Sequence, residues 1–186
     1  MAGPHVIEYV VRPDCTVVDV QGEWDTFATE NDAADLTVSA VVGHDLREFL
    51  GGAETRLIYQ ALIERILGTG RLVRFPFRCD SPDARRYMEM EIERPDPDLI
   101  RFRSRMIREE DRPAQPLFNT KVARSDELLV TCSWCKRVKT EGDVWVEVED
   151  YVASSGLMEA DVLPRLTHGV CPDCEESMDA LIESAE

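Results

Sequence analysis

Four cysteines near the end of the chain constrain its fold more than any other feature. They form two Cys-x-x-Cys pairs, Cys132 with Cys135 and Cys171 with Cys174, and 35 residues (136–170) separate the pairs. Each pair sets two sulfurs on one side of a tight turn, at the spacing that a tetrahedral metal ion requires. The pattern predicts that the four thiolates bind one metal ion and that the segment folds around it.

Zinc in a structural role is the metal that we expect, because a long spacer with room for a helix is typical of structural zinc modules. Four thiolates also hold a single iron, as in rubredoxin, or an iron–sulfur cluster. A redox dithiol is disfavoured, since two matched pairs are redundant for that chemistry. The usual haem c motif is excluded because Lys136, not histidine, follows Cys135. Catalytic zinc keeps one position open to water, which four cysteines do not.

His168 lies three residues before Cys171 and has three interpretations. It replaces a cysteine as a ligand, it donates a hydrogen bond to a thiolate from outside the ligand set, or it packs or caps without touching the site. We favour the third interpretation, and the second over the first.

The chain of 186 residues is long enough for one ordinary domain and a small appendage. Pro113 and Pro116 cannot both lie in a helix and favour an extended connection. We therefore predict a domain over 1–112, a linker over 113–127 and a four-cysteine module over 128–186. The module has little core of its own, so a metal ion is its expected stabiliser.

Periodicity predicts a mixed α+β first domain. Helical spacing marks one long helix, in which Leu57, Ile58, Leu62 and Ile66 recur on one side. Period-two alternation with one apolar face marks half-buried antiparallel strands. The expected strands are 6–11, 16–20, 71–80, 87–93 and 99–107, and the expected helices are 22–31, 43–50 and 53–67.

Charge supports a hairpin between the last two strands. Glu89, Glu91 and Glu93 alternate along the first, and Arg101, Arg103 and Arg105 along the second. Opposite charges across paired strands contribute about 0.2–1 kcal/mol each, so they specify register more than stability. The arginine row as a stripe for an acidic ligand is disfavoured, because the glutamate row neutralises it.

The element order, with "VVGHDLREFL" (41–50) and "FPFRCDSPDARRYMEMEI" (75–92), resembles the PAS sensor domain over residues 5–110. The resemblance implies a ligand such as flavin, haem or a small metabolite between the sheet and the long helix, or dimerisation without a ligand. Light-sensing flavin domains carry a reactive cysteine in the helical region, whereas Cys15 and Cys79 fall on predicted strands. We expect His44, the candidate haem ligand, to face solvent.

Eight apolar side chains are expected on the inner face of this domain. We interpret them first as core and second as a small-molecule pocket, because apolar faces are usually core. They are Trp24, Phe27, Leu62, Phe75, Phe77, Met88, Met90 and Phe102.

The end of the chain carries a more specific resemblance. "CSWCKRVK" and "THGVCPDC" look like a zinc-finger-like segment at the ends of bacterial two-component and PAS signalling proteins, over residues 130–175, with Thr167 where serine is usual. A helix is expected over 143–151, where the valines also allow a strand, and another over 175–184. Little biochemical function transfers with this resemblance.

The net charge of −16 disfavours nucleic acid and anionic membranes as partners, since both attract basic groups. No apolar run is long enough for a membrane helix, and no secretory signal is visible, so we expect a cytoplasmic protein. No nucleophile–base pair, phosphate loop or open metal triad indicates an enzyme. The sequence predicts a bacterial signalling protein that acts through a protein partner or as a homodimer. The alternative is a rubredoxin-like electron carrier.

Overall fold

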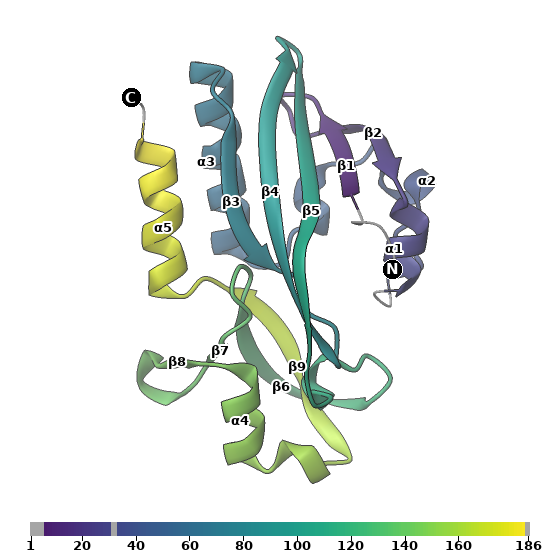
Figure 1. Cartoon of the computed structure of the whole chain (residues 1–186), viewed down its shortest axis with the longest axis vertical. Coiled ribbons are helices and arrows are strands. Elements are labelled where there is room, and N and C mark those ends of the chain that lie inside the picture. Colours follow the sequence, from purple (N-terminus) through teal and green to yellow (C-terminus); the bar gives the residue numbers. More distant parts are fainter. Residues whose placement is uncertain (1–5, 31–32, 185–186) are drawn as a thin grey trace.

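The structure, a computed structural model, describes residues 6–30 and 33–184. Two sheets are stacked along the long axis of the molecule (Figure 1). A five-stranded sheet with helix α3 on one face forms one end, and a four-stranded sheet with helix α4 forms the other. Helix α5 returns from the second sheet to lie beside α3. None of the described helices is long and apolar enough to cross a membrane.

The first sheet has the predicted element order of two strands, helices, a long helix and three strands. Its strands are entirely antiparallel, in the spatial order β2-β1-β5-β4-β3. The elements are β1 (Val6–Val11), β2 (Val17–Gly22), α1 (Trp24–Glu30), α2 (Val38–Val41), the 3-10 helix η1 (Leu46–Phe49), α3 (Ala53–Thr69), β3 (Val73–Arg78), β4 (Ala84–Asp96) and β5 (Leu99–Asp111). Asn31, the predicted end of the first helix, lies outside the described residues.

Helix α3 packs its apolar side on the sheet and ends at Gly70, whose left-handed conformation suits glycine. Ile58, Leu62 and Ile66 are buried as predicted. The prediction for Leu57 is wrong, because its side chain is 66% exposed. Leu57 projects from the edge of the buried stripe and lines a groove between α3 and α5.

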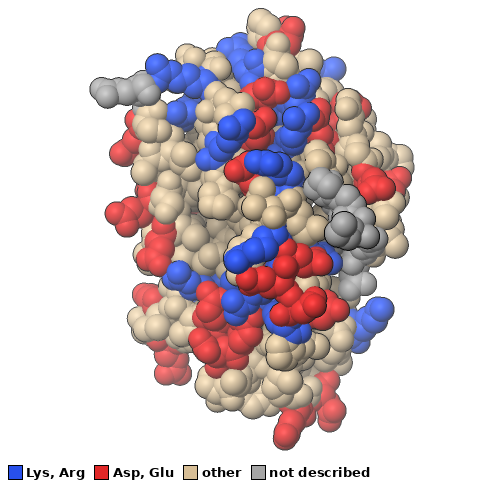
Figure 2. Space-filling model, viewed as in Figure 1, with Lys and Arg blue, Asp and Glu red and all other residues tan. Residues whose placement is uncertain are grey.

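The β4–β5 hairpin has the predicted register, with Glu89, Glu91 and Glu93 opposite Arg105, Arg103 and Arg101. Ion pairs join Arg105 to Glu89 at 2.7 Å and Arg101 to Glu93 at 2.8 Å. The middle pair exchanges partners, because the flanking strands supply Glu8 for Arg103 and Arg74 for Glu91. Figure 2 shows the resulting interleaved charges on this face, so the arginine row is neutralised as expected.

The second sheet has the order β8-β7-β6-β9, and β6 pairs with β9 in parallel. The two long strands of this sheet, β6 and β9, were not predicted from the sequence. The predicted linker 113–127 contains a 3-10 helix and the start of β6, and the expected helix at 143–151 divides between β8 and α4. The elements are η2 (Pro116–Phe118), β6 (Ala123–Cys132), β7 (Val138–Lys139), η3 (Glu141–Asp143), β8 (Trp145–Val146), α4 (Val148–Ser155), η4 (Leu157–Glu159), β9 (Val162–Gly169) and α5 (Pro172–Glu183).

A buried ion cluster joins the two sheets. Arg78 at the end of β3 pairs with Asp80 and with Glu147, which precedes α4. Arg112 pairs with Asp80 at 3.0 Å and with Glu149 of α4 at 2.9 Å. The side chain of Asp80 is fully buried and that of Arg112 is 4% exposed. The two sheets are therefore held together by desolvated charges, which are costly to separate one at a time.

Candidate metal centre

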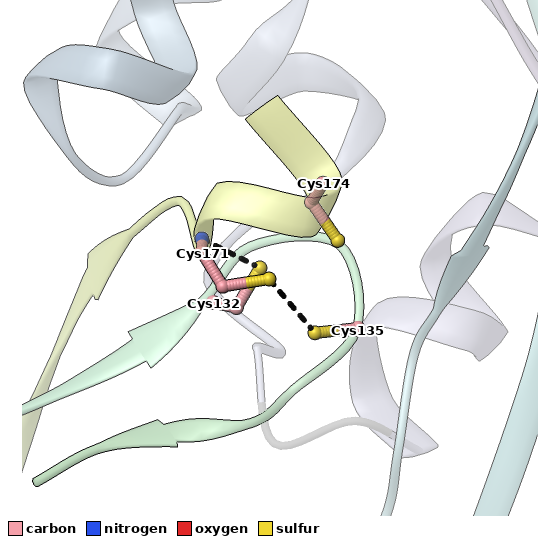
Figure 3. A group of neighbouring side chains, drawn as sticks. All are labelled: Cys132, Cys135, Cys171 and Cys174. Carbon is pink, nitrogen blue, oxygen red and sulfur yellow. Dashed lines mark hydrogen bonds between the residues drawn. The ribbon is translucent and has the colours of Figure 1, made fainter. Parts of the chain in front are cut away.

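The four cysteines lie together at one end of the second sheet (Figure 3). Their Sγ atoms all lie within 4.8 Å of one another, and those of Cys135 and Cys171 are 3.6 Å apart. Cys132 and Cys171 are fully buried, whereas Cys135 and Cys174 are half-buried. The structure therefore brings the two cysteine pairs together in one cluster, as their spacing in the sequence predicted.

The parallel strands bring the two pairs to the same place. After a register shift between Arg124 and Leu128, β6 pairs continuously with β9 up to Cys132, which lies opposite Gly169. The amide of Ser133 donates to the carbonyl of Gly169 at 2.9 Å, which ties the first turn to the second. A Cβ on Gly169 would lie 2.9 Å from Cγ1 of Val130, so this close approach favours glycine. The register of β6 on β9 therefore positions the ligands.

The donor set fits a tetrahedral ion. Zinc bound to four sulfurs at about 2.3 Å requires sulfurs about 3.8 Å apart, close to the separation of Cys135 and Cys171. Cys171 caps α5, Pro172 occupies its first turn as predicted, and Cys174 follows in the same turn. The partial positive charge at a helix N-terminus favours thiolates there. The amide of Cys171 also donates to Sγ of Cys132 at 3.5 Å.

The thiols affect one another strongly. Hydrogen bonds from Cys135 and Cys174 lower the pKa of Cys132 far below its ordinary value. Hydrogen bonding to Cys132 and the charge of that thiolate raise the pKa of Cys135 to about 12 and that of Cys174 further. The first thiol thus ionises easily and the later ones with difficulty. A bound cation offsets this repulsion, and a metal ion deprotonates its thiol ligands.

His168 lies outside the cysteine cluster. The only ligand group found among the described residues consists of the four cysteines, and no described hydrogen bond joins His168 to any of them. Its ring lies against the loop before α3, since a Cβ on Gly51 would fall 2.4 Å from Nδ1 of His168. Partial loss of hydration lowers the pKa of His168, and the charge of Lys136 lowers it further. This position agrees with the interpretation that His168 packs against the protein without touching the cysteine cluster.

Trp134, between the first two cysteines, enters the core of the first domain. Its side chain is 5% exposed, and its ring centroid lies 6.2 Å from that of Tyr59 on α3 and 6.4 Å from that of Phe75 on β3. The amide of Arg78 donates to its carbonyl at 2.7 Å. Our sequence reasoning gave Trp134 no role. The sequence does contain an indication of this contact. A large apolar side chain between two cysteines of a short turn is expected to be buried against another part of the protein.

The eight predicted inner-face residues do not line one pocket. Leu62, Phe75, Met90 and Phe102 are buried in the shared core with Trp134. Trp24 lines a cavity of about 200 Å³ at the β2 side, while Phe75 and Phe77 line another of about 200 Å³ beside the cysteine module. Met88 is buried and Phe27 is half-buried, and neither lines these two cavities.

The remaining candidate residues have clear positions. His44 is exposed and pairs with Glu48 at 3.6 Å, as expected for a surface histidine. Cys15 is buried in the turn between β1 and β2 rather than on a strand, with φ of 73°. Cys79 follows the end of β3 and lines the cavity beside the module, where burial raises its pKa.

Comparison with known proteins finds similarity in structure alone. No family model and no curated protein matches the sequence. A domain of an HTR-like protein from Haloarcula marismortui ATCC 43049 is 15% identical, with 55% of this chain and 98% of that chain covered and a TM-score of 0.41. The PAS domain of the RpfR quorum-sensing receptor of Cronobacter turicensis, solved with C12:0, is 6% identical, with 58% and 99% covered and a TM-score of 0.44.

The class of the protein follows from its own topology. The chain is an α+β protein with a PAS-like antiparallel sheet flanked by helices. A cluster of four cysteines, able to hold a metal ion, lies in its C-terminal region.

Proposed function

We propose that the protein is a bacterial cytoplasmic sensory protein whose PAS-like part is joined to an output surface by a structural zinc ion. The observation that carries this proposal is the position of Trp134. The residue lies between two metal ligands and also in the core beneath α3 and β3. An ion that orders the Cys132–Cys135 turn therefore also orders the packing of the sensory part. Four cysteines leave no open coordination position, so we propose that the ion is structural and that the protein acts through a partner rather than as an enzyme.

Native mass spectrometry tests the metal. We expect one zinc ion per chain after purification under reducing conditions, with the thiol protons displaced. Loss of all metal from the reduced, folded protein contradicts the proposal. A single iron in the same site is the alternative, as in rubredoxin. It predicts a coloured, redox-active sample, whereas the zinc protein is colourless.

The groove between α3 and α5 is the surface that we propose for the protein partner. Its lining combines apolar residues with three carboxylates, namely Leu57, Ile58, Ala61 and Ile182 with Glu54, Glu175 and Asp179. Three carboxylates without a basic residue in the lining favour a basic amphipathic helix. The same charge disfavours a second copy of this acidic chain, because like charges would face each other.

A helical peptide of leucine and lysine, labelled with a fluorophore, probes this groove. Leu57→Ser should weaken its binding by about tenfold, since a central apolar contact is lost. Leu128→Ser is the matched control, because Leu128 on β6 is also 66% exposed but lies outside the groove. Equal affinity of the two variants contradicts the proposal. So does a dimer in light scattering that Leu57→Ser dissociates, since it assigns the groove to self-association.

A further inference from the structure

The cavity beside the cysteine module is built by both parts of the chain. It measures about 200 Å³. The first domain contributes Phe49, Tyr59, Phe75 and Phe77, and the module contributes Trp134, Lys136 and His168. Pockets for drug-sized ligands are larger, about 300–1,000 Å³, so the volume suits a small molecule. The other cavity, near Trp24, is lined by residues of the first domain alone.

The lining combines aromatic and basic side chains. Arg78 and Lys136 both line it, and no carboxylate does, although the chain has 37 acidic residues against 21 basic ones. The guanidinium of Arg78 is already engaged by Asp80 and Glu147. Lys136 forms no ion pair with a carboxylate among the residues that the structure describes. Its Nζ donates to the carbonyl of Ser133 at 2.9 Å, which leaves donors free, since an ammonium has three.

The backbone at Lys136 adds a second observation. Lys136 has φ of 64°, in the left-handed region that favours glycine and asparagine. Its amide donates to the carbonyl of Cys132 at 3.1 Å, so the metal-binding turn imposes this conformation. A residue held against its conformational preference beside a cavity indicates a use for its side chain. The ammonium is that side chain's only charged group.

We propose that this cavity binds a small aromatic carboxylate, with its ring between the aromatic side chains and its carboxylate on Lys136. His168 also lines the cavity and offers a further polar contact, since a neutral imidazole both donates and accepts. The inference rests on the proposed sensory function and names the class of its ligand. A ligand in this cavity would contact both parts of the chain, because the first domain and the cysteine module each contribute lining residues.

Titration calorimetry with phenylacetate tests the proposal, and phenylacetamide is the neutral isostere. We expect phenylacetate to bind with one site per chain and the amide to bind at least about tenfold more weakly, because the amide loses the charge-assisted hydrogen bond. Chemical shift changes in the amides of Thr55 and Ser133, which both line the cavity, should locate the ligand there.

Two variants separate the outcomes. Lys136→Asn removes the charge but keeps a residue that tolerates positive φ, and it should weaken phenylacetate about tenfold. Lys139→Asn is the control, because Lys139 pairs with Asp143 away from the cavity. No binding, equal binding of acid and amide, or equal affinity of the two variants overturns the proposal. Zinc content measured on the same samples reports separately on the proposed function, so either claim can fail alone.

Discussion

At the scale of single residues, the cysteines and His168 have different roles. The cysteines share a cluster with sulfurs within 4.8 Å, and His168 packs on Gly51 and Gly52 instead. Cys171→Ala should therefore lose the metal and unfold the module, because three ligands bind the ion poorly and its binding energy is also folding energy. His168→Ala should retain one ion per chain. Metal analysis of the purified variants checks both, and loss of metal from His168→Ala would make it a ligand.

Trp134 extends from the turn between Cys132 and Cys135 into the core of the first domain. Trp134→Ala should destabilise the protein by about 3–5 kcal/mol, since a large buried aromatic side chain leaves a cavity. Urea denaturation measures this loss, and the metal content should not change, because the thiols remain. Trp134→Phe, which fills much of the same space, is the control. A loss below about 1 kcal/mol would show that the ring contributes little to the shared core.

At the scale of elements, the ion cluster between β3, β5 and α4 holds the two sheets together. Asp80→Ala should destabilise the protein by about 3–5 kcal/mol, because Arg78 and Arg112 then remain buried without their shared partner. Asp143→Ala is the matched control. Asp143 also pairs with a cation, Lys139, but its side chain is 82% exposed, so little or no loss of stability is expected. Equal effects in thermal unfolding would contradict a role for burial.

The same cluster makes the junction sensitive to acid. Burial alone raises the pKa of Glu149, but hydrogen bonds from Arg85 and Arg112 outweigh it and lower the pKa from 4.5 to about 2. A depressed pKa adds stability that is fully present above the ordinary value and is lost as the pH falls towards 2. Between about pH 4.5 and 2, unfolding followed by circular dichroism should show less pH dependence in Glu149→Gln than in the wild type. Identical slopes would exclude Glu149 as the titrating group.

Elements with a regular pattern of apolar residues could be predicted from the sequence. Elements that depend on pairing with a distant segment of the chain could not. Alternation predicted the β4–β5 hairpin and its register, because one face is buried and the other carries complementary charges. It did not predict β6 and β9, since parallel strands far apart in sequence leave no local turn between them. Leu57 was placed on the apolar side of the long helix, but it is exposed, because periodicity marks that side and not where its contact with the sheet ends.

The candidate site, too, could be predicted from the sequence only in part. The spacing of the two Cys-x-x-Cys pairs predicted that the four cysteines lie together, because one tetrahedral ion requires that arrangement, and the structure places their Sγ atoms within 4.8 Å of one another. The cavity with Lys136 and the contact of Trp134 depend on how the two parts dock, which no local pattern records. Arg78 and Arg112 belong to the buried ion cluster between the two sheets. Their burial arises from the carboxylates of Glu147 and Glu149, which come from a distant part of the chain.

At the scale of the whole molecule, the cysteine cluster and the five-stranded sheet share one buried core. Cys132, Trp134, Cys171 and Met178 belong to the same buried cluster as Leu62 and Phe102. Two separate domains, at 1–112 and 128–186, joined by a linker would each unfold independently of the other. The shared core implies instead that order in one part depends on the other.

Hydrogen–deuterium exchange, with the metal bound and after its removal by a chelator, tests this coupling most directly. The account predicts faster exchange after metal removal in the Cys132–Cys135 turn, in α3 and in β3, because Trp134 then leaves the core that they form. Faster exchange confined to residues 123–184, with α3 and β3 unchanged, would contradict the account.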